Sequence, residues 1–477
     1  MNGYQFNFST PEQQGVKSEA ILEFLEAVLH CRTQNMDQDF HSVIIARHGT
    51  VIAEGWWEPY AKEMQHMLFS LSKSFTSTAV GLAVSEGLLT VNDLVTDYFK
   101  DECPTPTGYL AQMRIKHLLS MSTGHIVDTM GFLQEREDGN WVKAFLNVPV
   151  EKEPGTHFLY NTGATYMLSV IVQRVTGLKL IDYLQPRLFE PLGIINPTWE
   201  ECPMGYNTGG FGLSIRTEDI AKFGQLYLSQ GTLNGKQILP KEWIAEATCA
   251  HISNGSDSNS DWCQGYGYQF WRCRHNIYRG DGAFGQYCIV MPDYDMVVAI
   301  TSGLKDMQIP LNLLWDHLLP GIGDNKLPES AAYQELMDKL NSLKVLLPEG
   351  DDTSEIAEEV AGKCFTLDEN EDHIESISFT FEKDTIHLHI TACGKKQTLN
   401  AGIGTWAANY LESFDRKVPV RLTGTWQSST TLLIQCRFVE TPFAKQFRFT
   451  FTKEGLIAET KGNVGFEEPG WNRILGK

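Results

Sequence analysis

A serine and a lysine stand three residues apart in the run Ser70-Leu71-Ser72-Lys73. The residues before this run resemble an extended segment, and Ser74 to Glu86 carry apolar side chains at helical spacing before Gly87. On the first turn of a helix, positions i and i+3 share a face, so the Lys73 amine can reach the Ser70 hydroxyl. Free backbone N–H groups at a helix start can stabilise an oxyanion. The stretch therefore predicts a nucleophile, a base and an anion site.

The motif alone also allows a structural interpretation. Ser70 could simply cap a helix, with Lys73 solvated on its first turn. A second S-x-x-K, Ser302-Gly303-Leu304-Lys305, follows a strand-like run at Met296 to Thr301, and no helix opens on it. For this second copy we predict a surface loop without a catalytic role.

A tyrosine precedes another helical pattern in Tyr160-Asn161-Thr162-Gly163, and the apolar stripe of that helix spans Ala164 to Thr176. Such a tyrosine can relay a proton if a neighbouring ammonium lowers its pKa from the usual value near ~10. The alternative is a packed loop tyrosine. The same letters recur at Tyr206-Asn207-Thr208-Gly209, where no helix follows.

A glycine-rich run, Gly280-Asp281-Gly282-Ala283-Phe284-Gly285-Gln286, formally matches G-x-G-x-x-G. A dinucleotide site needs a helix after this motif, whereas the residues from Tyr287 to Val290 predict a strand. A glycine-rich edge strand instead lets a substrate backbone approach closely. The sequence contains no G-x-S-x-G elbow and no H-E-x-x-H zinc motif. We therefore expect neither an organic cofactor nor a metal.

The elements that must position these residues follow a definite order. Residues 42–47 and 50–56 are β-rich and joined across His48-Gly49, which predicts a hairpin. Helical periodicity dominates from 70 to about 250, including a helix from Thr217 to near Gly231. β character returns at 266–272, 286–290 and 296–301. This order predicts an α/β sandwich, an antiparallel sheet with a helical insertion, with the Ser70 helix between sheet and insertion.

The chain of 477 residues is too long for one ordinary core. We predict a first domain at 1–325, a linker with a short helix at 326–354, and a C-terminal domain at 355–477. The last segment alternates apolar and polar residues, as in Ile377, Phe379 and Phe381, which predicts an antiparallel β barrel or sandwich. Its expected role is to pack on the first domain or to mediate an oligomer.

Composition excludes several partners. The formal net charge of −20 disfavours nucleic acid and anionic membranes. No apolar run approaches the length of a membrane span, and the first residues lack a secretory signal pattern. The ten cysteines form no C-x-x-C pair, which suits reduced thiols. We expect a cytoplasmic protein that acts on small molecules.

The ordered set of motifs resembles the β-lactamase-related serine hydrolases over roughly residues 10–320. That superfamily includes class C β-lactamases, D-alanyl-D-alanine carboxypeptidases, lactamase-fold esterases and 6-aminohexanoate-dimer hydrolases. The resemblance implies Ser70 as nucleophile, Lys73 as base, Tyr160 as proton relay, and the N–H groups of Ser70 and Ala283 as oxyanion hole. It rests on Phe69 to Phe75, His117 to Gly124, Phe158 to Asn161, Gly209 to Leu213 and Gly282 to Gln286.

The chain departs from the family pattern at two motifs. The family's second motif is usually Tyr-x-Asn, whereas Thr162 holds the third position here and the asparagine is Asn161. Its third motif usually begins with Lys or His, whereas Gly280 stands here, followed by Asp281 and Gly282. The missing cation argues against a substrate carboxylate, although Arg279 could partly substitute.

The sequence therefore predicts a serine hydrolase that forms an acyl-enzyme on small esters or amides. The alternatives are a β-lactamase or D-stereospecific peptidase, and a non-catalytic binding or assembly protein that keeps the fold.

Overall fold

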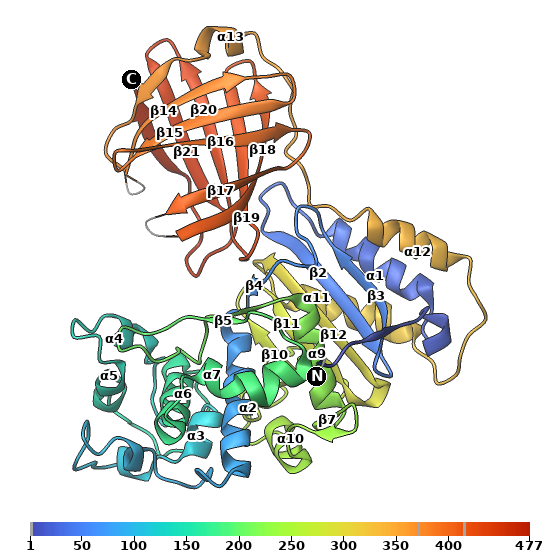
Figure 1. The fold of residues 1–477 in the computed structure, drawn as a ribbon, viewed down its shortest axis with the longest axis vertical. Coiled ribbons are helices and arrows are strands. Elements are labelled where there is room, and N and C mark those ends of the chain that lie inside the picture. The colour runs from blue at the N-terminus through green and yellow to red at the C-terminus, as the bar shows by residue number, and fades with distance from the viewer. Residues whose placement is uncertain (1–2, 371–372, 414–415) are drawn as a thin grey trace.

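The β-rich runs near residue 45 form two neighbouring strands of a seven-stranded sheet in the computed structural model (Figure 1). The structure describes residues 3–370, 373–413 and 416–477. The strand order is β1-β3-β2-β12-β11-β10-β9, and every pair is antiparallel except β1 with β3. The strands are β1 (Asn7–Phe8), β2 (Gln38–Arg47), β3 (Thr50–Trp56), β9 (Trp271–Arg272), β10 (Tyr278–Gly282), β11 (Gln286–Met291) and β12 (Met296–Leu304).

Both faces of this sheet are covered, because successive side chains of a strand point to opposite faces. Val43 and Ile45 of β2 pack into a core beneath α1 (Ser18–His30), α11 (Gln308–Leu313) and α12 (Ala332–Asn341). Ile44 and Ala46 belong to the core on the other face. The predicted α/β sandwich is thus confirmed, and the sheet with its helices is called the sandwich below.

The second face carries the helical insertion between β3 and β9. Its helices are α2 (Ser72–Ser85), α3 (Ile115–Leu119), α4 (Met130–Gln134), α5 (Trp141–Asn147), α6 (Thr162–Thr176), α7 (Leu180–Leu184), α8 (Glu190–Leu192), α9 (Thr217–Leu228) and α10 (Lys241–Thr248). Its short strands are β4 (His66–Met67), β5 (Thr198–Trp199), β6 (Leu213–Ile215), β7 (Thr232–Leu233) and β8 (Lys236–Gln237). Short 3₁₀ or π turns occur both inside and outside the insertion. They are η1 (Glu12–Gln14), η2 (Phe69–Leu71), η3 (Val95–Tyr98), η4 (Leu110–Gln112), η5 (Gln185–Phe189), η6 (Pro292–Tyr294), η7 (Leu314–Leu318) and η8 (Leu319–Gly321).

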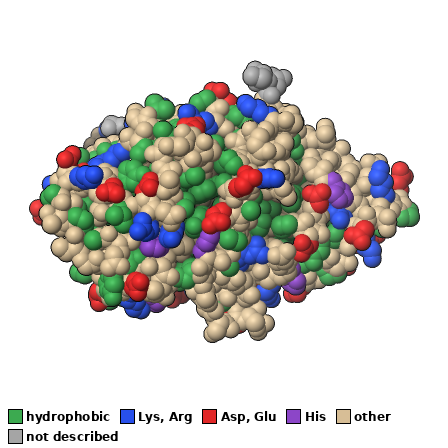
Figure 2. All heavy atoms as spheres, turned by 90° about the horizontal axis from the view of Figure 1, so that it is seen from below, with side chains coloured by type: hydrophobic (Ala, Val, Ile, Leu, Met, Phe, Trp, Pro, Cys, Tyr) green, Lys and Arg blue, Asp and Glu red, His purple; other side chains and the backbone are tan. Residues whose placement is uncertain are grey.

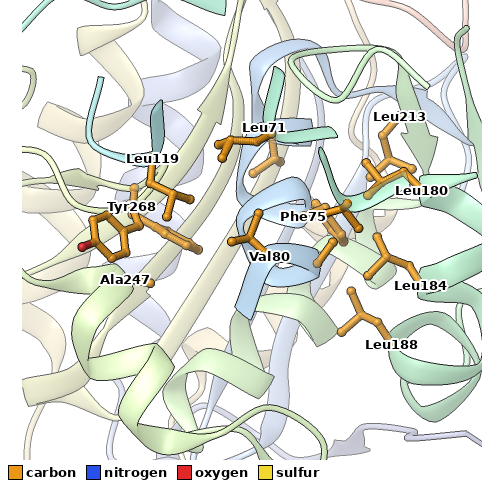
Figure 3. Packing of buried hydrophobic residues seen from close by; sticks show 14 of the residues in the cluster. Leu71, Phe75, Val80, Leu119, Leu180, Leu184, Leu188, Leu213, Ala247 and Tyr268 are labelled. Atoms are coloured by element: carbon orange, nitrogen blue, oxygen red, sulfur yellow. The ribbon is translucent and has the colours of Figure 1, made fainter. Parts of the chain in front are cut away.

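Helix α2 lies at the centre of this insertion. Figure 3 shows Phe75 facing Leu184 and Leu213, and Val80 facing the side of Leu119 and Tyr268. The helix is buried from Ser72 to Ala83, and it begins two residues after Ser70. Ser70 itself lies in the preceding 3₁₀ turn η2, where the sequence had indicated the first helical turn. Packing on every side therefore fixes the turn that carries the serine.

The C-terminal segment forms a nearly closed, mainly antiparallel barrel, as one of the two predicted architectures (Figure 1). Its first and last strands meet through a bridge between Leu367 and Gly476, and β16 pairs with β18 in parallel. Its interior contains Phe379, Trp426 and Phe449. The elements are α13 (Ile356–Val360), β13 (Cys364–Thr366), β14 (Ile374–Phe381), β15 (Thr385–Ala392), β16 (Lys395–Ile403), β17 (Ala407–Ser413), β18 (Arg416–Ser428), β19 (Thr431–Phe438), β20 (Ala444–Thr452), β21 (Gly455–Gly462) and β22 (Asn472–Gly476).

The barrel docks on the sandwich through buried polar contacts. Arg437 of β19 pairs with Asp39 of β2 at 2.8 Å, and both side chains are buried. The backbone N–H of Met67 in β4 donates to the carbonyl of Glu440 at 2.8 Å. Because β4 leads directly into η2, the barrel touches the segment that carries Ser70.

Two local predictions need correction. The second S-x-x-K is no surface loop, because Ser302 is fully buried in β12 and its hydroxyl donates to the carbonyl of Phe284. The expected strand at 266–272 shrinks to β9, since the residues before it form turns and bends.

The surface of the molecule carries charges of both signs. Acidic and basic side chains are interspersed on the face shown in Figure 2. Within the described ranges, no helix is long and apolar enough to cross a membrane. The ten cysteines are unpaired.

Candidate active site

A cavity of about 800 Å³ brings most of the predicted residues together. Ser70, Tyr160, Thr162, Asp281 and Ala283 all line it, although they come from η2, the loop before α6, α6, β10 and the turn after β10. The cavity thus forms where the helical insertion meets one end of the sheet.

Ser70 and Lys73 contact each other directly. The Lys73 Nζ lies 2.9 Å from the Ser70 Oγ, because η2 runs straight into α2 and places residues i and i+3 on one face. The same Nζ donates to the carbonyl of Gly210 at 2.8 Å and lies 3.5 Å from the Thr162 Oγ1. The Lys73 side chain is 1% exposed, which excludes the solvated lysine of the structural interpretation.

Burial changes the acidity of this lysine. Loss of water lowers the pKa of Lys73 from 10.5 to about 7, and the charges of Asp128 and Asp281 oppose that shift only in part. Near neutral pH a large fraction of the amine is therefore unprotonated. A neutral amine can donate to Gly210 and direct its lone pair at the Ser70 hydroxyl, which is the arrangement of a general base.

Tyr160 lies against this pair. Its ring centroid is 4.9 Å from the Lys73 Nζ, and the ring stacks on Trp271 at 5.3 Å. From the sequence we expected a neighbouring ammonium to lower the pKa of Tyr160. Instead, burial and the charge of Asp281 raise the pKa of Tyr160 well above its usual value, and hydrogen bonding to Ser70 only partly opposes this. Tyr160 is therefore a neutral phenol that can donate a proton.

The two residues after Tyr160 separate in space. Thr162 lines the cavity beside Lys73. Asn161 is fully buried, and its side-chain oxygen accepts from the N–H and the hydroxyl of Thr129 at 3.1 and 2.8 Å. The structure therefore brings Thr162, and not Asn161, to the wall of the cavity.

The glycine-rich run lies on β10, beside the Ser70 turn. A Cβ on Gly282 would be 1.9 Å from the carbonyl oxygen of Leu68, and a Cβ on Gly280 would be 2.5 Å from the Leu71 side chain. Both glycines thus allow close packing of strand on turn. This approach places Ala283 on the same cavity wall as Ser70, where the two backbone N–H groups could face one carbonyl oxygen.

Arg279 does not reach the cavity. Its guanidinium is fully buried, donates from Nε to Asp281 at 3.0 Å, and also donates from Nη1 to the carbonyl of Asp261 at 2.7 Å. The charged side chains in the described lining are all acidic: Asp128, Glu200 and Asp281. The lining therefore offers no cation to a substrate carboxylate.

Several lining residues had no signal in the sequence. Asp128 belongs to no motif, yet its Oδ1 accepts from the N–H of Thr162 at 2.9 Å and fixes the start of α6. Phe443 and Phe466 also line the cavity, and both come from the barrel. Only the docking of the barrel reveals them.

The S-x-x-K motif also occurs in class A β-lactamases and penicillin-binding proteins. The chain belongs to the Beta-lactamase family, whose model matches residues 34–308.

This chain is similar to a hydrolase and an esterase. The 6-aminohexanoate-dimer hydrolase of Paenarthrobacter ureafaciens is 25% identical over 344 residues, which cover 66% of this chain and 84% of that protein. The lovastatin esterase of Penicillium rubens is 28% identical over 150 residues, or 27% of this chain and 37% of that protein. Among solved structures, the octameric penicillin-binding protein homologue from Pyrococcus abyssi has a TM-score of 0.51 at 17% identity, covering 96% of this chain and 99% of its own.

Proposed function

We propose that this chain is a serine hydrolase that cleaves small esters or amides through an acyl-enzyme on Ser70. The observation that carries the proposal is the buried Lys73 amine, 2.9 Å from the Ser70 Oγ, with a pKa lowered to about 7. A catalytic base works best when its pKa lies near the working pH.

In the first step, Lys73 takes the proton of Ser70 while the Oγ attacks the substrate carbonyl carbon. The N–H groups of Ser70 and Ala283 stabilise the negative oxygen that forms. Tyr160 donates a proton to the leaving oxygen or nitrogen as its bond to carbon breaks, and Lys73 restores the phenol proton. In the second step, the neutral Lys73 amine, with the Tyr160 hydroxyl as proton relay, takes a proton from a water molecule as the water oxygen attacks the acyl carbon. The proton passes to the Ser70 Oγ as its bond to the acyl carbon breaks, which releases the acid product and the free serine.

The acidic lining sets the substrate class. Asp128 and Glu200 disfavour a carboxylate in the cavity, and Arg279 is engaged by Asp281 and held away from the cavity. The proposal therefore favours neutral substrates over β-lactams or free peptide C-termini, both of which carry a carboxylate. Assembly through the barrel stays a prediction that light scattering can check.

The test is labelling with a small fluorophosphonate, with Ser70→Ala as control. Stoichiometric labelling of Ser70 is expected, and its absence in a folded protein would favour the non-catalytic alternative. Hydrolysis of p-nitrophenyl esters and of nitrocefin is then compared. Efficient nitrocefin turnover with negligible ester hydrolysis would make a β-lactamase the better assignment.

A further inference from the structure

Two phenylalanines of the barrel lie in the wall of the Ser70 cavity. Phe443 follows the turn between β19 and β20, and Phe466 lies in the segment between β21 and β22. They share this wall with Phe69, the residue directly before the nucleophile. Barrel residues more than 370 positions after Ser70 in the chain therefore complete the wall of the cavity.

The phenylalanines of this wall belong to one cluster of aromatic rings. The Phe69 ring lies 6.0 Å from the Phe443 ring and 6.1 Å from the Phe466 ring, in edge-on contacts. Phe284, next to Ala283, lies 5.6 Å from Phe443 and 5.2 Å from Phe466. Both Phe69 and Phe284 have positive φ, at 47° and 65°, which is uncommon for a bulky residue. The rings of the barrel thus contact the residues that flank both proposed oxyanion donors.

Phe466 keeps most of its surface in water. Its side chain is 82% exposed, more than any other large apolar side chain in the described ranges. Leaving an aromatic ring exposed forgoes the free energy that its burial would release. An apolar group that enters the cavity would cover this ring, so the exposed face at the mouth suits a ligand better than the packing of the barrel.

Contacts between barrel and sandwich hold both phenylalanines in place. The turn before Phe443 is fixed by the Met67 N–H, which donates to Glu440 at 2.8 Å. The segment with Phe466 starts at the buried Asn463, whose Nδ2 donates to the carbonyl of Met36 at 3.3 Å. The same segment ends in an ion pair between Glu468 and Lys305 at 2.7 Å. Preorganised groups of this kind bind a ligand without first being ordered.

We propose that Phe443 and Phe466 of the barrel form a binding subsite for an apolar alkyl or aryl group of the substrate. The barrel is then a specificity element of the active site and does more than pack against it. This inference rests on the proposed hydrolase function, because it assigns the substrate class of that same cavity.

The experiment uses the full chain and the variant Phe466→Ala. Two series of ester substrates are compared. The first keeps the p-nitrophenyl leaving group and lengthens the acyl group from acetyl to hexanoyl. The second keeps the acetyl group and enlarges the leaving group from phenyl to 2-naphthyl. We expect kcat/KM for the larger member of at least one series to fall roughly 10-fold, with the smaller member within about 2-fold of wild type. Phe466→Leu should restore most of the loss.

Tyr410→Ala is the matched control, because Tyr410 is an exposed barrel aromatic, 63% accessible, that does not line the cavity. It should leave both series unchanged. The subsite would be overturned if, in both series, Phe466→Ala kept the wild-type ratio of kcat/KM for the larger substrate to kcat/KM for the smaller one. An equal loss of kcat/KM for every substrate is one such result. Failure of the hydrolase proposal is distinct, because the wild-type chain would then not be labelled on Ser70 by a small fluorophosphonate.

Discussion

Lys73 carries the chemistry that we propose, and the cost of burying it sets the working pH. Its pKa is lowered to about 7 by burial, so the neutral amine dominates only above that pH. We expect kcat/KM for p-nitrophenyl acetate to rise between pH 6 and 8 with an apparent pKa near 7. Lys73→Ala should lower the acylation rate at least ~100-fold with an unchanged circular dichroism spectrum. A flat profile over this range would exclude Lys73 as the base.

The same burial predicts a gain in stability when the amine is removed. Between about pH 7 and 10.5 the unfolded chain holds a proton on Lys73 that the folded chain lacks, so the free energy of unfolding rises with pH in this window. Below about pH 7 Lys73 is protonated in the folded chain too, so the full free-energy cost of burying the ammonium remains. Lys73→Met should therefore stabilise the protein at pH 7 by roughly 2 kcal/mol after the loss of hydrogen bonds, and less at pH 10. Urea unfolding at both pH values checks the sign.

The duplicated tetrapeptide supplies a matched pair for Tyr160. Tyr160→Phe removes the phenol beside Ser70 and Lys73, and we expect roughly a 100-fold loss in kcat. Tyr206 lies outside the lining of the cavity, so Tyr206→Phe should keep nearly full activity. Steady-state rates of both variants decide the matter, since equal losses would mean that the relay lies elsewhere.

At the residue scale the sequence predicted what depends on local spacing. Ser70 and Lys73 share one turn, so their contact follows from helix geometry alone. The acidity of Tyr160 depends on burial by distant segments, and its sign could not be read from the chain. Likewise, the Arg279 side chain could face either the cavity or Asp281. Its direction depends on side-chain packing that a motif does not encode.

At the scale of secondary-structure elements, the site forms because β10 packs closely against η2. Gly282→Ala would place a Cβ 1.9 Å from a backbone oxygen that cannot rotate away. We expect a loss of roughly 1–3 kcal/mol in unfolding free energy, with loss of ester hydrolysis as Ala283 is displaced. Gly131→Ala is the control, because its Cβ meets nothing within 4 Å in helix α4; a stability as low as that of Gly282→Ala would refute the packing argument.

Elements with strong periodicity were predictable, and those set by tertiary contacts were not. The hairpin of β2 and β3, helix α9 and the alternating barrel strands follow from residue pattern. The 3₁₀ turn at Ser70 and the burial of Ser302 do not, because each depends on what packs against it. Ser302 looks like a polar loop residue in sequence, yet carbonyls of the turn after β10 satisfy its hydroxyl.

At the scale of the whole molecule, the sequence predicted two domains but could not predict how they dock. Docking depends on contacts between residues about 400 positions apart, such as Asp39 with Arg437. Individually these look like ordinary strand residues of two different sheets. The aromatic wall of the cavity arises only from that docking, which is why no motif indicated Phe443 or Phe466.

The buried ion pair between barrel and sandwich gives the last prediction. Arg437 and Asp39 are 0% and 1% exposed and lie 2.8 Å apart, so Arg437→Met leaves an unpaired carboxylate in the interface. Removing one partner of a buried pair typically costs roughly 3 kcal/mol or more. We expect lower stability in urea together with a selective loss of kcat/KM for the larger ester, as the barrel phenylalanines leave the cavity. As a control, Glu468→Gln breaks the exposed pair with Lys305 and should not measurably alter the unfolding midpoint. If Arg437→Met is destabilised but keeps the wild-type substrate preference, substrate specificity does not depend on how the barrel docks.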